Sequence, residues 1–130
     1  MFIETPSAKV SKNGKETFEF LNDLANFEQL MPENIDKFEV LNENRFLFAL
    51  KGMPEIVLER KEEVQYTKLV LGAASDKLPF TLTADITEEN ENSSSVVLSF
   101  QGEFNAMMAM MIKTPITNFI NTLSQNLAKV

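Results

Sequence analysis

Apolar residues near the amino terminus recur every three to four positions, which is the spacing of an amphipathic helix. At the start of this stretch Asn13 is followed three residues later by Glu16, which is a capping-box pattern. The spacing therefore predicts a helix over 13–27. A short helical turn follows it, and Pro32 ends that turn.

Two other parts of the chain have the patterning of β-strands. Residues 2–10 predict a short first strand, with Pro6 at an edge or a bulge because proline cannot donate to a ladder. From Phe38 onward, apolar and polar residues alternate in six stretches separated by Gly, Pro, Asn or Ser clusters. This alternation predicts antiparallel strands with one buried and one exposed face. The buried faces of the last two strands are expected to hold Phe80, Leu82, Ala84 and Ile86, and then Val96, Leu98, Phe100, Gly102 and Phe104.

The end of the chain predicts a long helix from about residue 105 to the carboxyl terminus. One apolar stripe along this helix consists of Met108, Ile112, Ile116, Phe119, Leu123 and Leu127. The predicted order is therefore one strand, two helices, six strands and a long helix. An apolar sheet face and an apolar helix stripe bury each other most simply when the sheet curves around the helix. We therefore predict an α+β helix-grip arrangement of one domain over 1–130, with about seven antiparallel strands.

The composition narrows the class of protein. Hydrophobic residues make up 44% and charged residues 24% of the chain, the balance of an ordinary soluble globular protein. No apolar run approaches the roughly 20 residues that span a bilayer, and the start lacks a secretory signal, so a cytoplasmic protein is expected. A net charge of −7 argues against nucleic-acid binding and against electrostatic docking to anionic membranes.

The chain contains neither histidine nor cysteine. This absence removes Ser-His and Cys-His catalysis, imidazole metal sites and disulfides. The acidic hairpin tip at residues 89–95 has no regular ligand spacing, so a solvated loop is expected there rather than a metal site. We expect neither a metal nor another cofactor. An enzyme would need an aspartate, glutamate, tyrosine or arginine in its cavity with a perturbed pKa.

The predicted element order and two local stretches resemble a known superfamily. ETFEFLNDLANFEQLMP, at 16–32, is similar to the helix pair with which bacterial members open the domain, and FEVLNENRFLFALKG, at 38–52, is similar to the strands that follow. The local match lies at Phe18, Leu21, Asp23, Phe27 and Pro32. The chain thus resembles the START and birch-pollen-allergen-like (SRPBCC) superfamily, which has the helix-grip fold. Members include polyketide cyclases and dehydrases, lipid-transfer domains, ubiquinone-binding proteins and the carbon monoxide dehydrogenase G group.

This resemblance implies a cavity between sheet and last helix for a lipid-like, quinone-like or polyketide-like ligand. The residues expected to bind it are Phe46, Phe48, Leu58, Arg60, Phe80, Leu82, Leu98, Phe100, Met108, Met111, Ile112 and Phe119. Leu50, Ile56, Ala84, Ile116 and Leu123 are expected to face the same interior, and the alternative is that all of these residues are plain core. Catalytic relatives usually line the cavity with polar groups, often histidine, and relatives often carry tryptophan, which this chain lacks. Both departures favour a binding protein over the alternative, a cyclase or dehydratase.

Arg60 and Tyr66 are the polar candidates for ligand contact. Arg60 follows two apolar residues on one strand face, where its guanidinium can hold a carboxylate or a phosphate. The favoured alternative is that Arg60 lies beyond the cavity rim and pairs with a surface glutamate. Tyr66 opens the next strand, so its hydroxyl either bonds a ligand carbonyl or, as we favour, lies in water at the strand end.

Four methionines crowd the start of the last helix. Met107, Met110 and Met111 fall outside the centre of the stripe, so the core alone does not account for them. Methionine suits surfaces that fit variable apolar shapes. The three residues are therefore a flexible cavity mouth, a contact surface for a second copy or a protein partner, or are covered by the loop at 72–79. Pro115 removes one backbone hydrogen bond and is expected to loosen this end of the helix.

Overall fold

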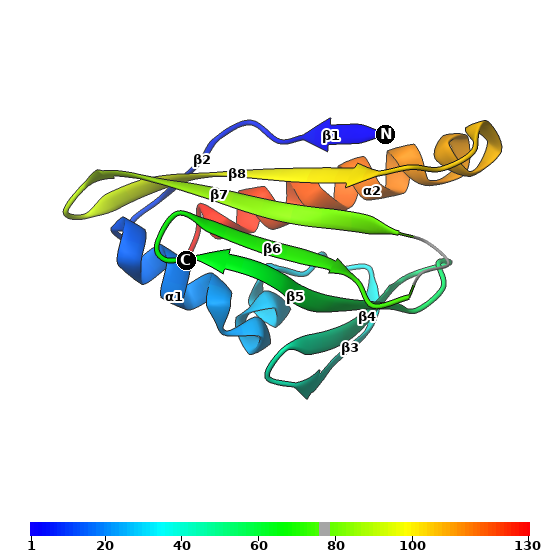
Figure 1. Ribbon diagram of the computed structural model, residues 1–130, viewed down its shortest axis with the longest axis horizontal. Helices are drawn as coiled ribbons and strands as arrows, with labels where there is room; N and C mark the ends of the chain where they lie inside the picture. The colour runs from blue at the N-terminus through cyan, green and yellow to red at the C-terminus, as the bar shows by residue number, and fades with distance from the viewer. Residues whose placement is uncertain (76–78) are drawn as a thin grey trace.

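The computed structural model describes residues 1–75 and 79–130 (Figure 1). Its helices are α1 (Gly14–Asn22), the 3-10 helix η1 (Leu24–Leu30) and α2 (Ala106–Leu127). Its strands are β1 (Phe2–Glu4), β2 (Ala8–Val10), β3 (Ile35–Asn42), β4 (Arg45–Leu50), β5 (Ile56–Val64), β6 (Lys68–Ala73), β7 (Phe80–Asn90) and β8 (Ser93–Gly102). Among the described residues, no helix combines the length and the apolar character needed to traverse a lipid bilayer.

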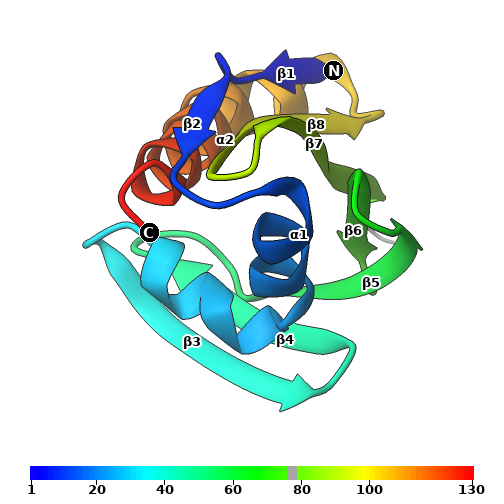
Figure 2. The ribbon, with the colours of Figure 1, turned by 90° about the vertical axis from the view of Figure 1, so that its left-hand side faces the viewer.

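The strands form one antiparallel sheet in the order β1-β8-β7-β6-β5-β4-β3, and β2 also pairs with β8. From β3 to β8, neighbouring strands are consecutive in sequence, so this part of the sheet is a meander. The sheet curves around the helices (Figure 2). α2 contacts β8, β2 and η1, while α1 contacts β6 and β7. The architecture is therefore the α+β helix-grip arrangement that the element order predicts.

The predicted first strand is two strands, because the segment around Pro6 leaves the ladder with β8. β1 and β2 pair with different parts of β8. Between them, the Thr5 amide donates to the Leu98 carbonyl at 2.9 Å, and the Leu98 amide donates to Thr5 Oγ1 at 3.1 Å. This division brings the described sheet to eight strands, where about seven were expected.

The predicted helix over 13–27 begins as expected and ends earlier. Asn13 Oδ1 accepts from the Glu16 amide at 2.9 Å, and the Asn13 amide donates to Glu16 Oε1 at 3.3 Å, which confirms the capping box. The predicted end is wrong, because α1 stops before Asp23, which has an extended conformation with φ −86° and ψ 100°. The Asp23 carboxylate accepts from the Ala25 amide at 3.2 Å and caps η1. Two helices are present as predicted, but the boundary between them lies at Asp23 instead of after Phe27.

Two strand boundaries also differ from the predicted ones. β3 begins at Ile35 rather than Phe38, and the pairing of β7 with β8 extends into the predicted loop at 89–95. Only residues 91–92 remain as the turn, where the Asn92 amide donates to Asn90 Oδ1 at 2.8 Å. Exposed polar residues were predicted to form a loop here, but their side chains do not prevent the backbone ladder from continuing.

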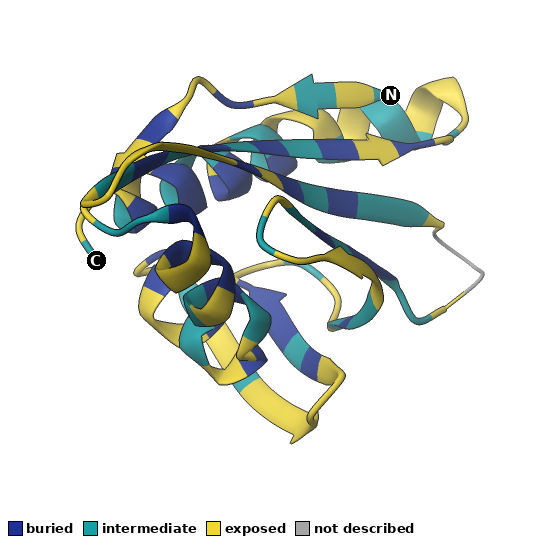
Figure 3. Cartoon of the chain, turned by 60° about the vertical axis from the view of Figure 1, so that its left-hand side comes forward, coloured by how far each residue is buried: buried dark blue, intermediate teal, exposed yellow. Residues whose placement is uncertain are grey.

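The core lies between the concave face of the sheet and the buried faces of α1, η1 and the later turns of α2 (Figure 3). The buried apolar residues of α2 are Ile116, Phe119, Ile120, Leu123 and Leu127. Aromatic rings extend the core toward β4, since Phe48 stacks on Phe119 with ring centroids 4.9 Å apart and Phe46 stacks on Phe27 at 5.2 Å. Met108, at the start of the stripe, is only partly buried. The later turns of α2 are therefore anchored in the core, whereas its first turns are more exposed.

A buried pair of hydroxyl groups joins α1 to β8 and provides a test of this packing. Thr17 Oγ1 and Ser94 Oγ lie 2.7 Å apart, and both residues are 0% exposed. Thr17→Val leaves a buried hydroxyl without this partner, so it should lower the free energy of unfolding by about 1–3 kcal/mol. The double variant Thr17→Val, Ser94→Ala should lose less than the sum of the single losses. Urea denaturation of the wild type, Thr17→Val, Ser94→Ala and the double variant gives the free energy of unfolding of each protein. Strictly additive losses would contradict the pairing.

Candidate ligand-binding site

An apolar cavity of about 290 Å³ lies where the first turns of α2 pass the ends of several strands. The turn after β4, the starts of β5 and β7, the end of β8 and the segment that follows β8 complete its walls. Its lining residues are Gly52, Met53, Pro54, Ile56, Phe80, Phe100, Phe104, Met108, Met111, Ile112 and Ile116. None of these residues has a hydrogen-bonding side chain, so we term this space the apolar cavity.

Three phenylalanine rings form one wall of the apolar cavity. Phe80 and Phe100 lie on neighbouring strands with ring centroids 5.0 Å apart, and Phe104 stacks on Phe100 at 6.2 Å. Phe104 can fold back because Gly102 has no side chain: a Cβ at this position would lie 2.6 Å from Phe104 Cε2 and 2.9 Å from Phe80 Cβ. Phe104 was absent from the predicted site. The alternation along β8 had placed it on the buried face, and that signal could have identified it.

The turn between β4 and β5 forms another wall. Gly52 has a φ of +82°, in the left-handed region that glycine adopts without strain. The Met53 amide donates to the Leu50 carbonyl at 2.9 Å, and the Lys51 amide donates to the Asn34 carbonyl at 3.1 Å. The turn is therefore held to β4 and to the segment that precedes β3. Its contribution was missed, because turn residues have no periodicity that assigns them to a face.

Some predicted ligand-binding residues line the apolar cavity, and others do not. Those that line it are Phe80, Phe100, Met108, Met111 and Ile112, together with Ile56 and Ile116 from the expected interior. Those that are almost fully buried in the core are Phe46, Phe48, Leu58, Leu82, Leu98 and Phe119. Ligand contact by the second group stays a prediction.

Arg60 connects β5 to two neighbouring segments. Its Nε donates to Asn22 Oδ1 at 3.0 Å, and its Nη2 donates to the Asn22 carbonyl at the end of α1. Its Nη1 donates to the Glu43 carbonyl at 3.1 Å and to Asn44 Oδ1, in the turn between β3 and β4. Glu63 forms an ion pair with it at 3.7 Å. The guanidinium is thus engaged by protein groups, and its role as a ligand anchor stays a prediction.

Tyr66 packs against α1. Its ring meets the Phe18 ring edge-on, with centroids 5.7 Å apart, and Lys15 Nζ lies 6.0 Å from the Tyr66 centroid. Packing against Phe18 and a cation–π interaction with Lys15 therefore account for an aromatic residue at this position. A hydrogen bond from its hydroxyl to a ligand stays a prediction.

The methionines at the start of α2 are exposed to solvent, line the apolar cavity, or do both. Met107, Met110 and Met111 are 73%, 82% and 67% exposed. Met108 is partly buried, and both Met108 and Met111 line the cavity. Residues 76–78 of the loop that was expected to cover them lie outside the described residues. The described part of the chain leaves the three exposed side chains largely uncovered.

The ionisable side chains of the described residues do not line the apolar cavity. No titratable side chain is among its described lining residues, and the described residues contain no group of three or more acidic residues arranged to hold a metal. On β5, a hydrogen bond from Lys61, together with the charge of Arg45, lowers the pKa of the Glu59 carboxyl below its ordinary value. Glu59 belongs to a surface ion-pair cluster with these two residues. The described lining of the cavity therefore provides apolar surface and no acidic or basic side chain.

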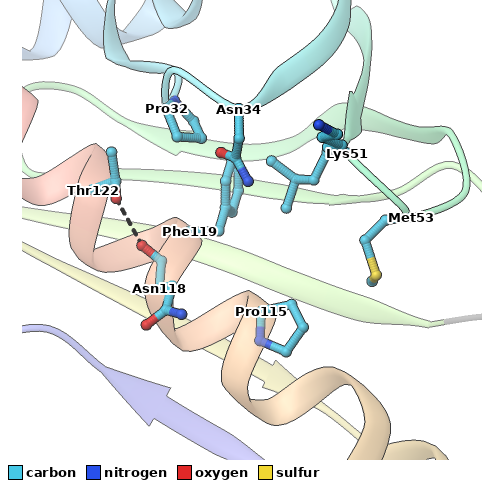
Figure 4. A pocket seen from close by; sticks show the side chains of 9 residues that line it. Pro32, Asn34, Lys51, Met53, Pro115, Asn118, Phe119 and Thr122 are labelled. Atoms are coloured by element: carbon cyan, nitrogen blue, oxygen red, sulfur yellow. Dashed lines mark hydrogen bonds between the residues drawn. The ribbon is translucent and has the colours of Figure 1, made fainter.

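A second hollow, of about 280 Å³, lies beside the next stretch of α2 (Figure 4). Its lining residues are Pro32, Asn34, Leu50, Lys51, Met53, Pro115, Asn118, Phe119 and Thr122. Unlike the apolar cavity, it includes one ammonium, two side-chain amides and one hydroxyl, so we term it the polar hollow. Met53 lines both spaces.

No family model matches the chain, and no curated protein matches it by sequence. Solved structures match it along nearly its whole length. A START superfamily protein from Mycobacterium smegmatis has a TM-score of 0.73 at 10% identity, covering 98% of this chain and 94% of that one. A point mutant of norcoclaurine synthase from Thalictrum flavum, in complex with a transition-state analogue, has a TM-score of 0.72 at 8% identity, covering 99% and 94%. The chain has the START-like helix-grip fold.

A further structure of the same synthase, in complex with dopamine and hydroxybenzaldehyde, has a TM-score of 0.69 at 9% identity and covers 95% of this chain and 84% of that one. The predicted resemblance to the START and birch-pollen-allergen-like proteins is thereby confirmed as a likeness of fold. The finer resemblance to the carbon monoxide dehydrogenase G group stays a prediction. At these identities the START-like fold is shared, and activity does not follow from it.

Replacing Gly102 should deform the aromatic wall of this START-like fold. In Gly102→Ala the new methyl group would overlap the Phe104 ring, which must then move. We expect overpacking to lower the free energy of unfolding by about 1–3 kcal/mol. Adding Phe104→Leu should recover part of this loss, because the smaller side chain leaves room. Urea denaturation of both variants is the measurement, and an unchanged stability of Gly102→Ala would contradict this packing.

Proposed function

We propose that the protein binds one small apolar or amphipathic molecule in the apolar cavity, as a carrier or binding protein. The observation that supports this most directly is the cavity lining, in which every described side chain is apolar. Such a lining gives water no hydrogen-bond partner, so an apolar ligand can replace water there at little cost. Each Å² of apolar surface that the ligand buries contributes roughly 25 cal/mol.

Binding without chemistry is favoured over a cyclase- or dehydratase-type activity. General acid–base catalysis needs a titratable group within hydrogen-bond reach of the substrate. None of the described lining residues of the apolar cavity carries one. The synthase with a similar fold was solved in complex with dopamine and hydroxybenzaldehyde. That complex supports the capacity of this fold to hold small organic molecules, and it supports no particular ligand for this chain.

The position of the apolar cavity is consistent with ligand exchange. It lies at the more exposed end of α2, beside methionines that are in contact with solvent. Pro115 lies in the middle of the helix and removes one backbone hydrogen bond, which loosens the turn before it. The first turns of α2 can therefore shift with less loss of packing than the buried later turns.

A neutral lipophilic dye should bind the folded protein saturably, with one site per chain. The chain has no tryptophan, so the dye provides the fluorescence signal. Ile112→Trp places a larger side chain in the cavity lining and should weaken dye binding roughly tenfold, or about 1.4 kcal/mol. Thr114→Trp, at an exposed position of the same helix, is the matched control and should bind like the wild type. The absence of saturable binding to several dyes of different shape would overturn the proposed function.

A second candidate function is the binding of a protein partner through the exposed methionines. Met107 and Met110 are 73% and 82% exposed on neighbouring turns of one helix. A cluster of exposed apolar side chains is typical of contact surfaces, whereas single exposed ones are ordinary. Neither residue lines the apolar cavity, so this function is separable from ligand binding.

Met107→Gln combined with Met110→Gln tests this second candidate. Stability should change by no more than about 0.5 kcal/mol per substitution, because both side chains are at the surface. Dye binding should persist, and any self-association of the wild type should be lost. Sedimentation velocity over a wide concentration range is the measurement. A wild-type protein that stays monomeric throughout would contradict self-association through this surface.

A further inference from the structure

The polar hollow and the apolar cavity are neighbours along the same two segments. In the turn after β4, Lys51 lines the polar hollow, Pro54 lines the apolar cavity, and Met53 lines both. On α2 the lining of the two spaces extends from Met108 to Thr122. That stretch is about 21 Å long at the rise of 1.5 Å per residue of an α-helix.

Each space alone lies at the lower end of the usual size of a ligand site. The apolar cavity measures about 290 Å³ and the polar hollow about 280 Å³. Ligand sites in proteins typically measure about 300–1,000 Å³, so the two spaces taken together fall well within this range. Met53 borders both of them, and an unbranched methionine side chain can change its torsions to open one space to the other.

The polar hollow presents hydrogen-bonding groups that the described residues do not use. Within the described chain, the Lys51 ammonium has no ion-pair partner or acceptor, and the side-chain amides of Asn34 and Asn118 are unbonded. Figure 4 shows Asn34 directed toward the Phe119 ring, with Asn118 and Thr122 on the helix nearby. A cation and two amides beside an aromatic ring are suited to an anionic oxygen group attached to an apolar chain.

We infer that the two spaces form one site for an amphipathic ligand with a carboxylate head group. The head group lies in the polar hollow against Lys51, Asn34 and Asn118, and the apolar tail passes Met53 into the apolar cavity. This inference rests on the proposed function, because the apolar cavity must bind the tail. It adds a ligand class: a fatty carboxylate is preferred over a neutral molecule with the same tail.

Dodecanoate and dodecanol, below their aggregation concentrations at pH 8, are the matched probes. Each is titrated against protein loaded with the neutral dye, and displacement gives its Kd. Dodecanoate should bind roughly tenfold more tightly than dodecanol, which is the effect of one hydrogen bond to a charged group. Lys51→Met keeps a side chain of similar length without the charge, and should abolish this preference. Lys113→Met removes an exposed lysine of α2 that lines neither space, and should retain the preference.

The outcomes separate this inference from the proposed function. Loss of the preference in Lys51→Met but not in Lys113→Met supports a head-group site in the polar hollow. Equal binding of dodecanoate and dodecanol by the wild type, or a preference that survives Lys51→Met, overturns the inference and leaves binding in the apolar cavity intact. Failure of both amphiphiles and of the dye to bind overturns the proposed function and the inference with it. Circular dichroism establishes that each variant is folded.

Discussion

The packing of the later turns of α2 into the concave face of the sheet is the interaction on which the rest of the structure depends. Phe119 stacks on Phe48 at 4.9 Å, and Leu123 and Leu127 are 0% exposed. These contacts fix the direction of the helix as it passes the sheet. Its first turns then lie beside strand ends and a turn rather than against a continuous strand face. The apolar cavity lies between these first turns and the strand ends, where Ile56, Phe80 and Phe100 line it from the sheet.

The sequence allowed the element order and the fold to be predicted because each depends on local periodicity. Alternation along β7 and β8 identified Phe80 and Phe100 correctly as inward residues, and both line the apolar cavity. The positions at which strands and helices end were harder to predict. Pro6 was recognised as an irregularity, but the division into two strands depends on the bonds between Thr5 and Leu98. Asp23 was included in a helix because its apolar neighbours keep helical spacing, although its side chain caps the following element instead.

The boundary between core and cavity could not be predicted, since periodicity assigns a residue to a face and says nothing of whether the space beyond it is filled. Phe46 and Phe100 have the same pattern in sequence, yet Phe46 is packed between other rings whereas Phe100 borders empty space. The turn that contributes Gly52 to the lining follows no period at all. Polar groups that have no partner within the described chain, such as Lys51, cannot be identified from the sequence either, because pairing depends on which segments the fold brings close.

If the protein has the proposed function, the chemistry of the two spaces also determines how selectively it binds its ligand. An apolar wall distinguishes ligands weakly, because one methylene group changes the binding free energy by only about 1–3 kcal/mol. Flexible methionines such as Met108 and Met111 weaken that distinction further, since they adapt to several shapes. Selectivity for a particular ligand must therefore come from directional polar contacts. Within the lining of these two spaces, such contacts are available in the polar hollow, where Lys51 supplies the charge.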